Sequence, residues 1–242
     1  MESQLAPTYD ANVLDLSGDA HSHMLPEWTR NTSLTHLVLM HNRITQIRHL
    51  SHLRKLRTLN LRANQIADIE NLDELAALEK LELYQNRIMR IQRLRGLDRL
   101  RLLDLSYNKI NAIENLADAG LHSLSELYLA SNRISEVVGL DNLSRLRTLE
   151  LGSNRIRAVP DLSHLSALEE LHLGRNKISA LDGLSGLARL RVLGVASNRL
   201  RSLEGLQSVR SLCELYADHN AIETMDAVAG LVGLQTLELS SN

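Results

Sequence analysis

The sequence has few of the residues that fill an ordinary protein core or cross-link one. Among 242 residues it has no phenylalanine, a single tryptophan at Trp28 and a single cysteine at Cys213. A lone cysteine excludes an intrachain disulfide framework. Because large aromatic side chains normally fill much of a core, we expect this core to repeat one aliphatic shape many times. The 52 leucines of the chain supply that shape.

Charge of one sign and long apolar runs are also missing. The 27 Lys and Arg nearly balance the 29 Asp and Glu, for a formal net charge of −2, so no general affinity for nucleic acid is expected. No apolar run approaches the roughly 18 residues of a membrane span, so no membrane partner is expected. The opening stretch MESQLAPTYD does not have the pattern of a secretory signal. Together with the lone cysteine, this predicts a cytoplasmic or nuclear location.

What is abundant is a repeat marked by asparagines. Ten of them follow one another at intervals of 22 residues, with a single interval of 24. Aligned on these asparagines, the units read LxxLxLxxNxI. A degenerate eleventh unit precedes them, with Leu14, Leu16 and Asp19 in the places of leucine, leucine and asparagine. The ten asparagines are Asn42, Asn64, Asn86, Asn108, Asn132, Asn154, Asn176, Asn198, Asn220 and Asn242.

This is the leucine-rich-repeat pattern, and each part of the unit predicts a local structure. Leu-x-Leu has period two, so it predicts a short strand with both leucines on one face. The other apolar residues recur every third position, which favours 3-10 turns over an α-helix. We therefore predict an α/β solenoid shaped like a horseshoe, with a concave parallel sheet of about ten strands. The convex side is predicted to hold 3-10 turns and short helical segments, and the asparagines to satisfy backbone groups where each strand ends.

The chain is predicted to divide into a cap and a repeat array. Residues 1–33 form an N-terminal capping segment with the degenerate repeat, in which Met24, Leu25 and Trp28 cover the first full repeat. Residues 34–242 form ten repeats, the last incomplete and without a C-terminal cap. Self-association through that uncapped edge is one expectation. The interval of 24 marks an insertion around Asp118–Gly120, which is expected to bulge on the convex side.

The residue between the two strand leucines points into the hollow of the horseshoe, so this row predicts the binding face. It contains four acids and three ring side chains but no Lys or Arg, whereas seven of the nine residues that follow an asparagine are basic. Like charges on neighbouring strands repel, and a basic partner would relieve that repulsion, while tyrosines favour an interface. The predicted partner-binding residues are Glu82, Asp104, Tyr128, Glu150, His172, Tyr216 and Glu238.

The sequence gives no pattern typical of a catalytic site. It has no phosphate-binding loop, no GxGxxG fingerprint and no GxSxG elbow. The ten histidines, including His21 and His23, lack the spacing of zinc ligands, and Cys213 is interpreted as a packing or rim residue. We therefore expect no catalytic residue, no cofactor and no metal site.

Several strings between the consensus positions resemble one family. LELGSNRIRAV at 149–159, LHLGRNKIS at 171–179, SNRLRSLEGLQ at 197–207 and CELYADHNAIE at 213–223 are similar to the leucine-rich-repeat regulatory subunits of protein phosphatase 1, the Sds-twenty-two type or regulatory subunit 7. The resemblance covers roughly residues 34–242. It implies a non-catalytic subunit whose concave face binds the phosphatase catalytic subunit. Nucleic acid is not an expected partner of that face, because its row is acidic. The residues matching that face by position are Asp104, Tyr128, Glu150, His172 and Glu238, His172 standing where the family has an aromatic.

An alternative function stays open at this point. Similar 22-residue repeats occur in scaffolds of cytoskeletal, axonemal and trafficking complexes. Capture of tubulin or dynein components, with no phosphatase, would favour a scaffold or adaptor.

Overall fold

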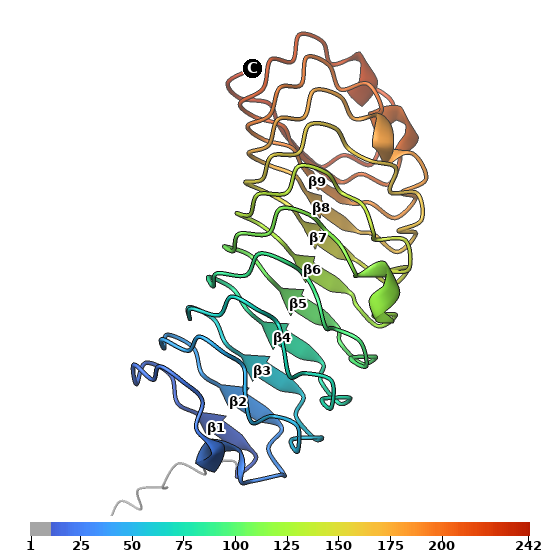
Figure 1. Ribbon diagram of the computed structural model, residues 1–242. Helices are drawn as coiled ribbons and strands as arrows, with labels where there is room; N and C mark the ends of the chain where they lie inside the picture. Colours follow the sequence, from blue (N-terminus) through green and yellow to red (C-terminus); the bar gives the residue numbers. More distant parts are fainter. Residues whose placement is uncertain (1–10) are drawn as a thin grey trace, which may run out of the picture.

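The computed structural model describes residues 11–242 as a curved stack of repeats around one parallel sheet (Figure 1). Eleven strands of three residues each follow one another across the sheet in sequence order. They are β1 Val13–Asp15, β2 His36–Val38, β3 Thr58–Asn60, β4 Lys80–Glu82, β5 Leu102–Asp104, β6 Glu126–Tyr128, β7 Thr148–Glu150, β8 Glu170–His172, β9 Val192–Gly194, β10 Glu214–Tyr216 and β11 Thr236–Glu238. The predicted leucine-rich-repeat solenoid is thereby confirmed.

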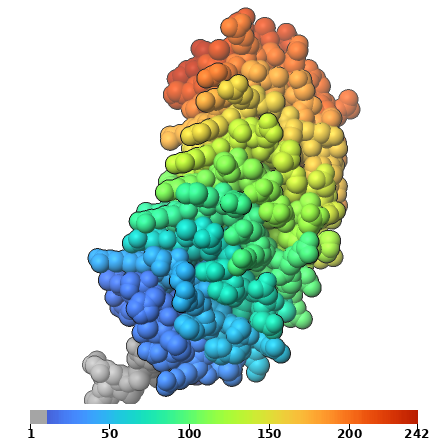
Figure 2. All heavy atoms as spheres, viewed as in Figure 1, coloured from blue at the N-terminus to red at the C-terminus, as the bar shows by residue number. Residues whose placement is uncertain are grey.

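The strands pair in one constant register, because each repeat brings its strand to the same position relative to the preceding strand. The central leucine of every strand faces the central leucine of the next, from Leu14 opposite Leu37 to Leu215 opposite Leu237. The degenerate unit at Leu14 therefore supplies a true strand, which makes eleven strands where the full motif occurs ten times. In the space-filling view, successive repeats lie as bands across the solenoid (Figure 2).

The connecting segments contain 3-10 turns, as the period of three predicts. Within residues 11–242 there are five short 3-10 helices and no α-helix. They are η1 Pro26–Thr29, η2 Ala117–Ala119, η3 Asp182–Leu184, η4 Leu206–Ser208 and η5 Asp226–Val228. The two-residue insertion forms η2, in the segment that leads from β5 to β6. The backbone leaves η2 at Gly120 with φ of +75°, a left-handed conformation that glycine adopts without steric cost.

One aliphatic core runs the length of the stack. Nearly all the leucines and isoleucines of the repeat consensus are buried, and most of them have no exposed surface. Each fully buried leucine contributes about 1.5–3 kcal/mol relative to an exposed one. At the first repeat Met24 is buried and Trp28 packs against the same core. The single tryptophan thus contacts the core from its margin and is not enclosed within it.

The asparagines form the predicted ladder of side-chain hydrogen bonds. Asn64 is typical: its Nδ2 donates to the carbonyls of Leu39 and Leu61 at 2.9 and 3.1 Å. Its Oδ1 accepts the backbone N–H of Ile44 at 2.9 Å. One amide thus satisfies backbone groups of two neighbouring repeats where the chain leaves the sheet, a place where unpaired groups would be costly.

The residue before each asparagine has a left-handed backbone, although none of the ten is glycine. Their φ values lie between 52° and 58°. The turn is held in place because the N–H of the same residue donates to the next repeat, as Ser131 does to Gly152 and Ser153 to Gly174. These side chains consequently line up along one edge of the sheet. They are His41, Ala63, Gln85, Tyr107, Ser131, Ser153, Arg175, Ser197, His219 and Ser241.

Two expectations from the sequence concern membranes and targeting. Between residues 11 and 242 there is no helix with the length and apolar character needed to span a bilayer. The opening stretch in which no secretory signal was found, residues 1–10, lies outside the described residues.

Candidate protein-binding face

The strand register places the predicted partner-binding residues in one row. Glu82 lies opposite Asp104, Asp104 opposite Tyr128, and Tyr128 opposite Glu150. The row continues from Glu150 to His172, passes Gly194, and ends with Tyr216 opposite Glu238. Adjacent members are separated by one strand spacing, about 4.8 Å. All seven residues therefore share one face, which we call the concave row.

The negative charge of Glu82 is compensated within the chain. The sequence of the concave row alone indicates that a cation of a partner would be needed. The Glu82 carboxylate is buried and lies 3.2 Å from Lys80 Nζ and 3.7 Å from Arg62 Nη1. The expected repulsion between Glu82 and Asp104 is present, since burial and, to a lesser extent, Glu82 raise the pKa of Asp104, but Lys80 and Arg62 compensate the charge of Glu82 within the chain. The compensating cations flank the row: Lys80 precedes the central leucine of β4, and Arg62 follows β3.

The position that Arg62 occupies in its repeat, and the left-handed turn after it, carry aromatic groups that the prediction omitted. Tyr84 follows β4, with the guanidinium of Arg62 4.6 Å from the centre of its ring. Tyr107 lies in the next turn, and its ring centre is 4.9 Å from that of Tyr84. This cluster forms the N-terminal part of the concave face and contains its own cation. The signal was available in the sequence, because residues two apart on a strand share a face.

Three alternate strands, β6, β8 and β10, carry a glutamate and a ring on either side of the central leucine. The Tyr128 hydroxyl donates to Glu126 Oε2 at 2.9 Å, and the Tyr216 hydroxyl donates to Glu214 Oε2 at 2.8 Å. On β8, His172 Nε2 lies 3.7 Å from Glu170 Oε2. Burial first, and then the hydrogen bond to Glu126, raises the pKa of Tyr128 well above its usual range. The Tyr128 hydroxyl therefore stays protonated and donates to Glu126.

Asp104 and Glu150 flank Tyr128 and differ from Glu82 in having no lysine or arginine within ion-pair distance, although Arg62 attracts Asp104 and His172 attracts Glu150 from farther away. Asp104 accepts the Ser106 N–H at 3.0 Å, and Glu150 accepts the Gly152 N–H at 2.6 Å. Neither forms an ion pair with a lysine or arginine of residues 11–242. Burial raises the pKa of both carboxyls, although these hydrogen bonds act in the opposite direction. Two partly desolvated carboxylates thus lie on either side of one tyrosine.

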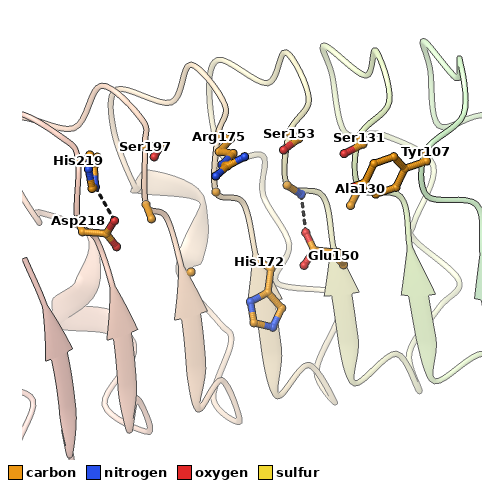
Figure 3. A pocket seen from close by; sticks show the side chains of 14 residues that line it. Tyr107, Ala130, Ser131, Glu150, Ser153, His172, Arg175, Ser197, Asp218 and His219 are labelled. Carbon is orange, nitrogen blue, oxygen red and sulfur yellow. Dashed lines mark hydrogen bonds and ion pairs between the residues drawn. The ribbon is translucent and has the colours of Figure 1, made fainter.

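Next to this part of the row lies an open groove of about 770 Å³ (Figure 3). Small residues after the second strand leucine, among them Ala130, Gly152 and Gly174, leave the space. Glu150 and His172 border it from the row, and Tyr107 and Arg175 border it from the left-handed turns. At its far end His219 Nδ1 lies 2.7 Å from Asp218 Oδ2. The groove is lined by carboxylates, imidazoles, hydroxyls and one guanidinium, which suits polar recognition.

The raised pKa of Glu150 predicts a pH-dependent effect of its neutralisation. A carboxyl whose pKa is higher in the folded state stabilises the fold when protonated, and this contribution is lost as the pH rises through the folded pKa. Glu150→Gln stays neutral and keeps an oxygen for the Gly152 N–H. We expect a higher free energy of unfolding than wild type at neutral pH, with the difference vanishing near pH 4, about the ordinary glutamate pKa. Urea unfolding across this range measures it.

The exposed residue Glu136 supplies the matched control for that comparison. Glu136→Gln is expected to change the free energy of unfolding by less than about 0.5 kcal/mol at any pH in the range. A less stable Glu150→Gln variant at neutral pH would contradict the prediction. It would mean that attraction to His172 and the Gly152 hydrogen bond outweigh the cost of burial.

The face has no arrangement of metal ligands. In the part of the chain that the structure describes, no three His, Cys, Asp or Glu side chains converge as they would around a metal ion. Cys213 is half-buried and is the one free cysteine. Its thiol lies 3.5 Å from the backbone oxygen of Ser211, at the opposite edge of the sheet from the groove.

Comparison with known proteins agrees with this geometry. The family model "Leucine rich repeat" matches residues 76–134 and 144–200, and "Leucine Rich repeats (2 copies)" matches residues 32–74 and 122–164. No curated protein sequence matches the chain. The chain belongs to the leucine-rich-repeat family, whose scaffold is suited to protein–protein interaction.

Solved structures with the same fold include several bacterial proteins. The functional domain of InlJ from Listeria monocytogenes is 23% identical, with a TM-score of 0.77 over 92% of this chain. An LRR protein of Leptospira interrogans is 23% identical, with a TM-score of 0.74 over 92% of this chain and 64% of its own length. The internalin InlF of Listeria monocytogenes is 27% identical, with a TM-score of 0.56 over 95% of this chain and 80% of its own. The chain spans 47% of the InlJ structure.

Proposed function

We propose that this chain is a non-catalytic binding subunit that recognises a basic surface of a partner protein with the centre of its concave row. The observation that carries the proposal is the arrangement of Asp104, Tyr128 and Glu150 on three successive strands. Both acids are partly desolvated, and neither has a lysine or arginine within ion-pair distance in residues 11–242, so their charges are offset only by the more distant Arg62 and by His172. A complementary cation is therefore the group that this surface binds best.

The geometry favours a lysine or arginine above the ring of Tyr128. The two acids lie two strands apart, about 9.6 Å, with the tyrosine between them. A cation over that ring gains a cation–π contact and interacts with a carboxylate on each side. It also offsets the cost of burying the two negative charges, so binding strengthens beyond what an exposed ion pair contributes.

We propose the catalytic subunit of protein phosphatase 1 as the partner. The support is the resemblance of residues 149–159, 171–179, 197–207 and 213–223 to phosphatase regulatory subunits of the Sds-twenty-two type. That family uses acidic and aromatic strand residues, and Asp104, Tyr128 and Glu150 have those characters here. The proposal includes a cytoplasmic or nuclear location.

Calorimetric titration with the purified phosphatase catalytic subunit tests the partner. A saturable one-to-one complex that weakens as salt is raised is the expected result, because exposed charge pairs are screened. No heat of binding would overturn the phosphatase assignment. In parallel, affinity capture from native cells followed by mass spectrometry distinguishes the alternative: recovery of tubulin or dynein components without phosphatase would favour a cytoskeletal scaffold.

A further inference from the structure

A second charged surface lies along the N-terminal ends of the strands, away from the groove. On alternate strands the third and first residues before the strand are both basic, and all eight of these residues are exposed. We call this surface the basic strip. It consists of Lys55 and Arg57 before β3, Arg99 and Arg101 before β5, Arg145 and Arg147 before β7, and Arg189 and Arg191 before β9.

The intervening strands have no basic residue at these two positions, and they fall into two kinds. Before β4 and β8 the first position is an acid, which neutralises the preceding arginine: Arg57 lies 3.7 Å from Glu79, and Arg147 lies 3.8 Å from Glu169. Before β6 and β10 the same position is Ser125 or Cys213. Charge alternation for stability would place an acid there too, because opposite charges on neighbouring strands stabilise their pairing.

An open depression of about 900 Å³ lies between β5 and β9, and its lining includes Ser125, which stands before β6 in place of an acid. Four arginines line it, and the one acid in its lining within the described chain is Glu126, whose Oε2 already accepts the Tyr128 hydroxyl. Arg101, Arg145 and Arg189 form no ion pair in residues 11–242. Four serines also line the space beside Ala167 and Ala188; the Ser125 hydroxyl already donates to the Arg101 carbonyl at 3.1 Å, which leaves the other three hydroxyls as donors for an anion. The serines are Ser123, Ser125, Ser144 and Ser166.

The spacing of the arginines indicates the shape of the anion. Basic pairs on every second strand recur at about 9.6 Å, twice the strand spacing. A peptide in the extended polyproline II conformation has three residues per turn and advances about 3.1 Å per residue, so every third side chain lies on one face and recurs at nearly the same interval, about 9.3 Å. Guanidinium groups bind carboxylates with two parallel hydrogen bonds, which adds to the charge attraction.

We propose that this depression binds an extended acidic segment of a partner protein, with acidic side chains at every third position. Arg101, Arg145 and Arg189 each bind one carboxylate, and the serine hydroxyls bind the backbone and remaining oxygens. The site is separate from the concave row and carries the opposite charge. It therefore adds a second contact to the scaffold and does not depend on the identity of the concave partner.

Fluorescence anisotropy with a labelled peptide of sequence Glu-Gly-Ser-Glu-Gly-Ser-Glu tests the site. Arg145→Glu combined with Arg189→Glu is expected to weaken binding at least about tenfold, since each reversal replaces an attraction by a repulsion. The matched control is Arg155→Glu with Arg199→Glu, which makes the same charge change at exposed positions at the other edge of the same repeats. The control is expected to bind the peptide within about twofold of wild type, because distant exposed charges are screened.

Three results would overturn the proposal. Equal losses in the two double variants would show attraction to overall charge and not to this site. Equal binding of a peptide with its three glutamates adjacent would remove the spacing argument. Tighter binding of a single-stranded oligonucleotide, lost in Arg145→Glu with Arg189→Glu, would make the surface a nucleic-acid site. Glu150→Arg is expected to retain peptide binding, so failure of the concave face and failure of this site are distinguishable.

Discussion

Replacing Asn108 by alanine is expected to lower the free energy of unfolding by about 3–5 kcal/mol. The buried amide donates to the carbonyls of Leu83 and Leu105, each at 3.0 Å, and accepts the N–H of Ile88 at 2.9 Å. Alanine removes these bonds, together with the one donated to the Ser106 carbonyl at 3.2 Å, and leaves backbone groups of two repeats unpaired away from water. Each unsatisfied buried group costs about 1–3 kcal/mol. Urea unfolding followed by circular dichroism measures the loss.

Asn111 provides the control for that loss, because it is the same residue type three positions along and is exposed. Asn111→Ala is expected to stay within about 0.5 kcal/mol of wild type. If Asn108→Ala also stayed within that limit, the amide ladder would be a consequence of the stacking and not a cause of its stability.

The second large effect concerns binding: Glu150→Arg is expected to reduce affinity for the concave partner by about a hundredfold or more. The new cation lies beside Tyr128, where the proposed partner inserts its own lysine or arginine. Attraction is thus replaced by repulsion in a partly desolvated place, where charges interact more strongly than in water. Titration calorimetry with the phosphatase catalytic subunit measures the change.

Glu136→Arg makes the same charge reversal at an exposed position outside the concave face and is expected to retain binding. Circular dichroism of both variants checks that each is folded. Unchanged affinity in a folded Glu150→Arg protein would exclude this face as the phosphatase contact, even if the phosphatase itself binds.

The strands, the ladder and the concave row were predictable because each depends on local spacing. Leu-x-Leu fixes which residues share a face, and the interval of 22 fixes which residues become neighbours. Asn64 and Tyr128 are therefore found in the expected places. Even the degenerate strand at Leu14 could be predicted from two leucines.

The pairing of Glu82 was not predictable by the same route. Its partners Arg62 and Lys80 lie on either side of the row, one of them in the preceding repeat. Whether long side chains reach across repeats depends on their conformations and on burial, which spacing does not specify. For the same reason, sequence could not show that Asp104 and Glu150 are partly desolvated and have no lysine or arginine within ion-pair distance.

The basic strip was missed for a different reason. Aligning the units at 22 residues treats every repeat as equivalent, so Arg145 and Ser123 appear as ordinary variation at one position. When the units are aligned two repeats at a time, the basic pairs are seen to recur on every second strand. The glutamate and ring of β6, β8 and β10 also recur on every second strand. A period of two repeats was present in the sequence but hidden by the shorter one.

The constant register has a consequence for how this protein folds. Every strand pairs with its sequence neighbours alone, and the ladder hydrogen bonds between repeats join residues only 20 to 27 positions apart. Loop closure is therefore equally short everywhere, and the folding nucleus has no obligatory location. A repeat made more stable than the others would become the place where ordering begins. Single substitutions are therefore expected to change the order in which the repeats of this chain fold.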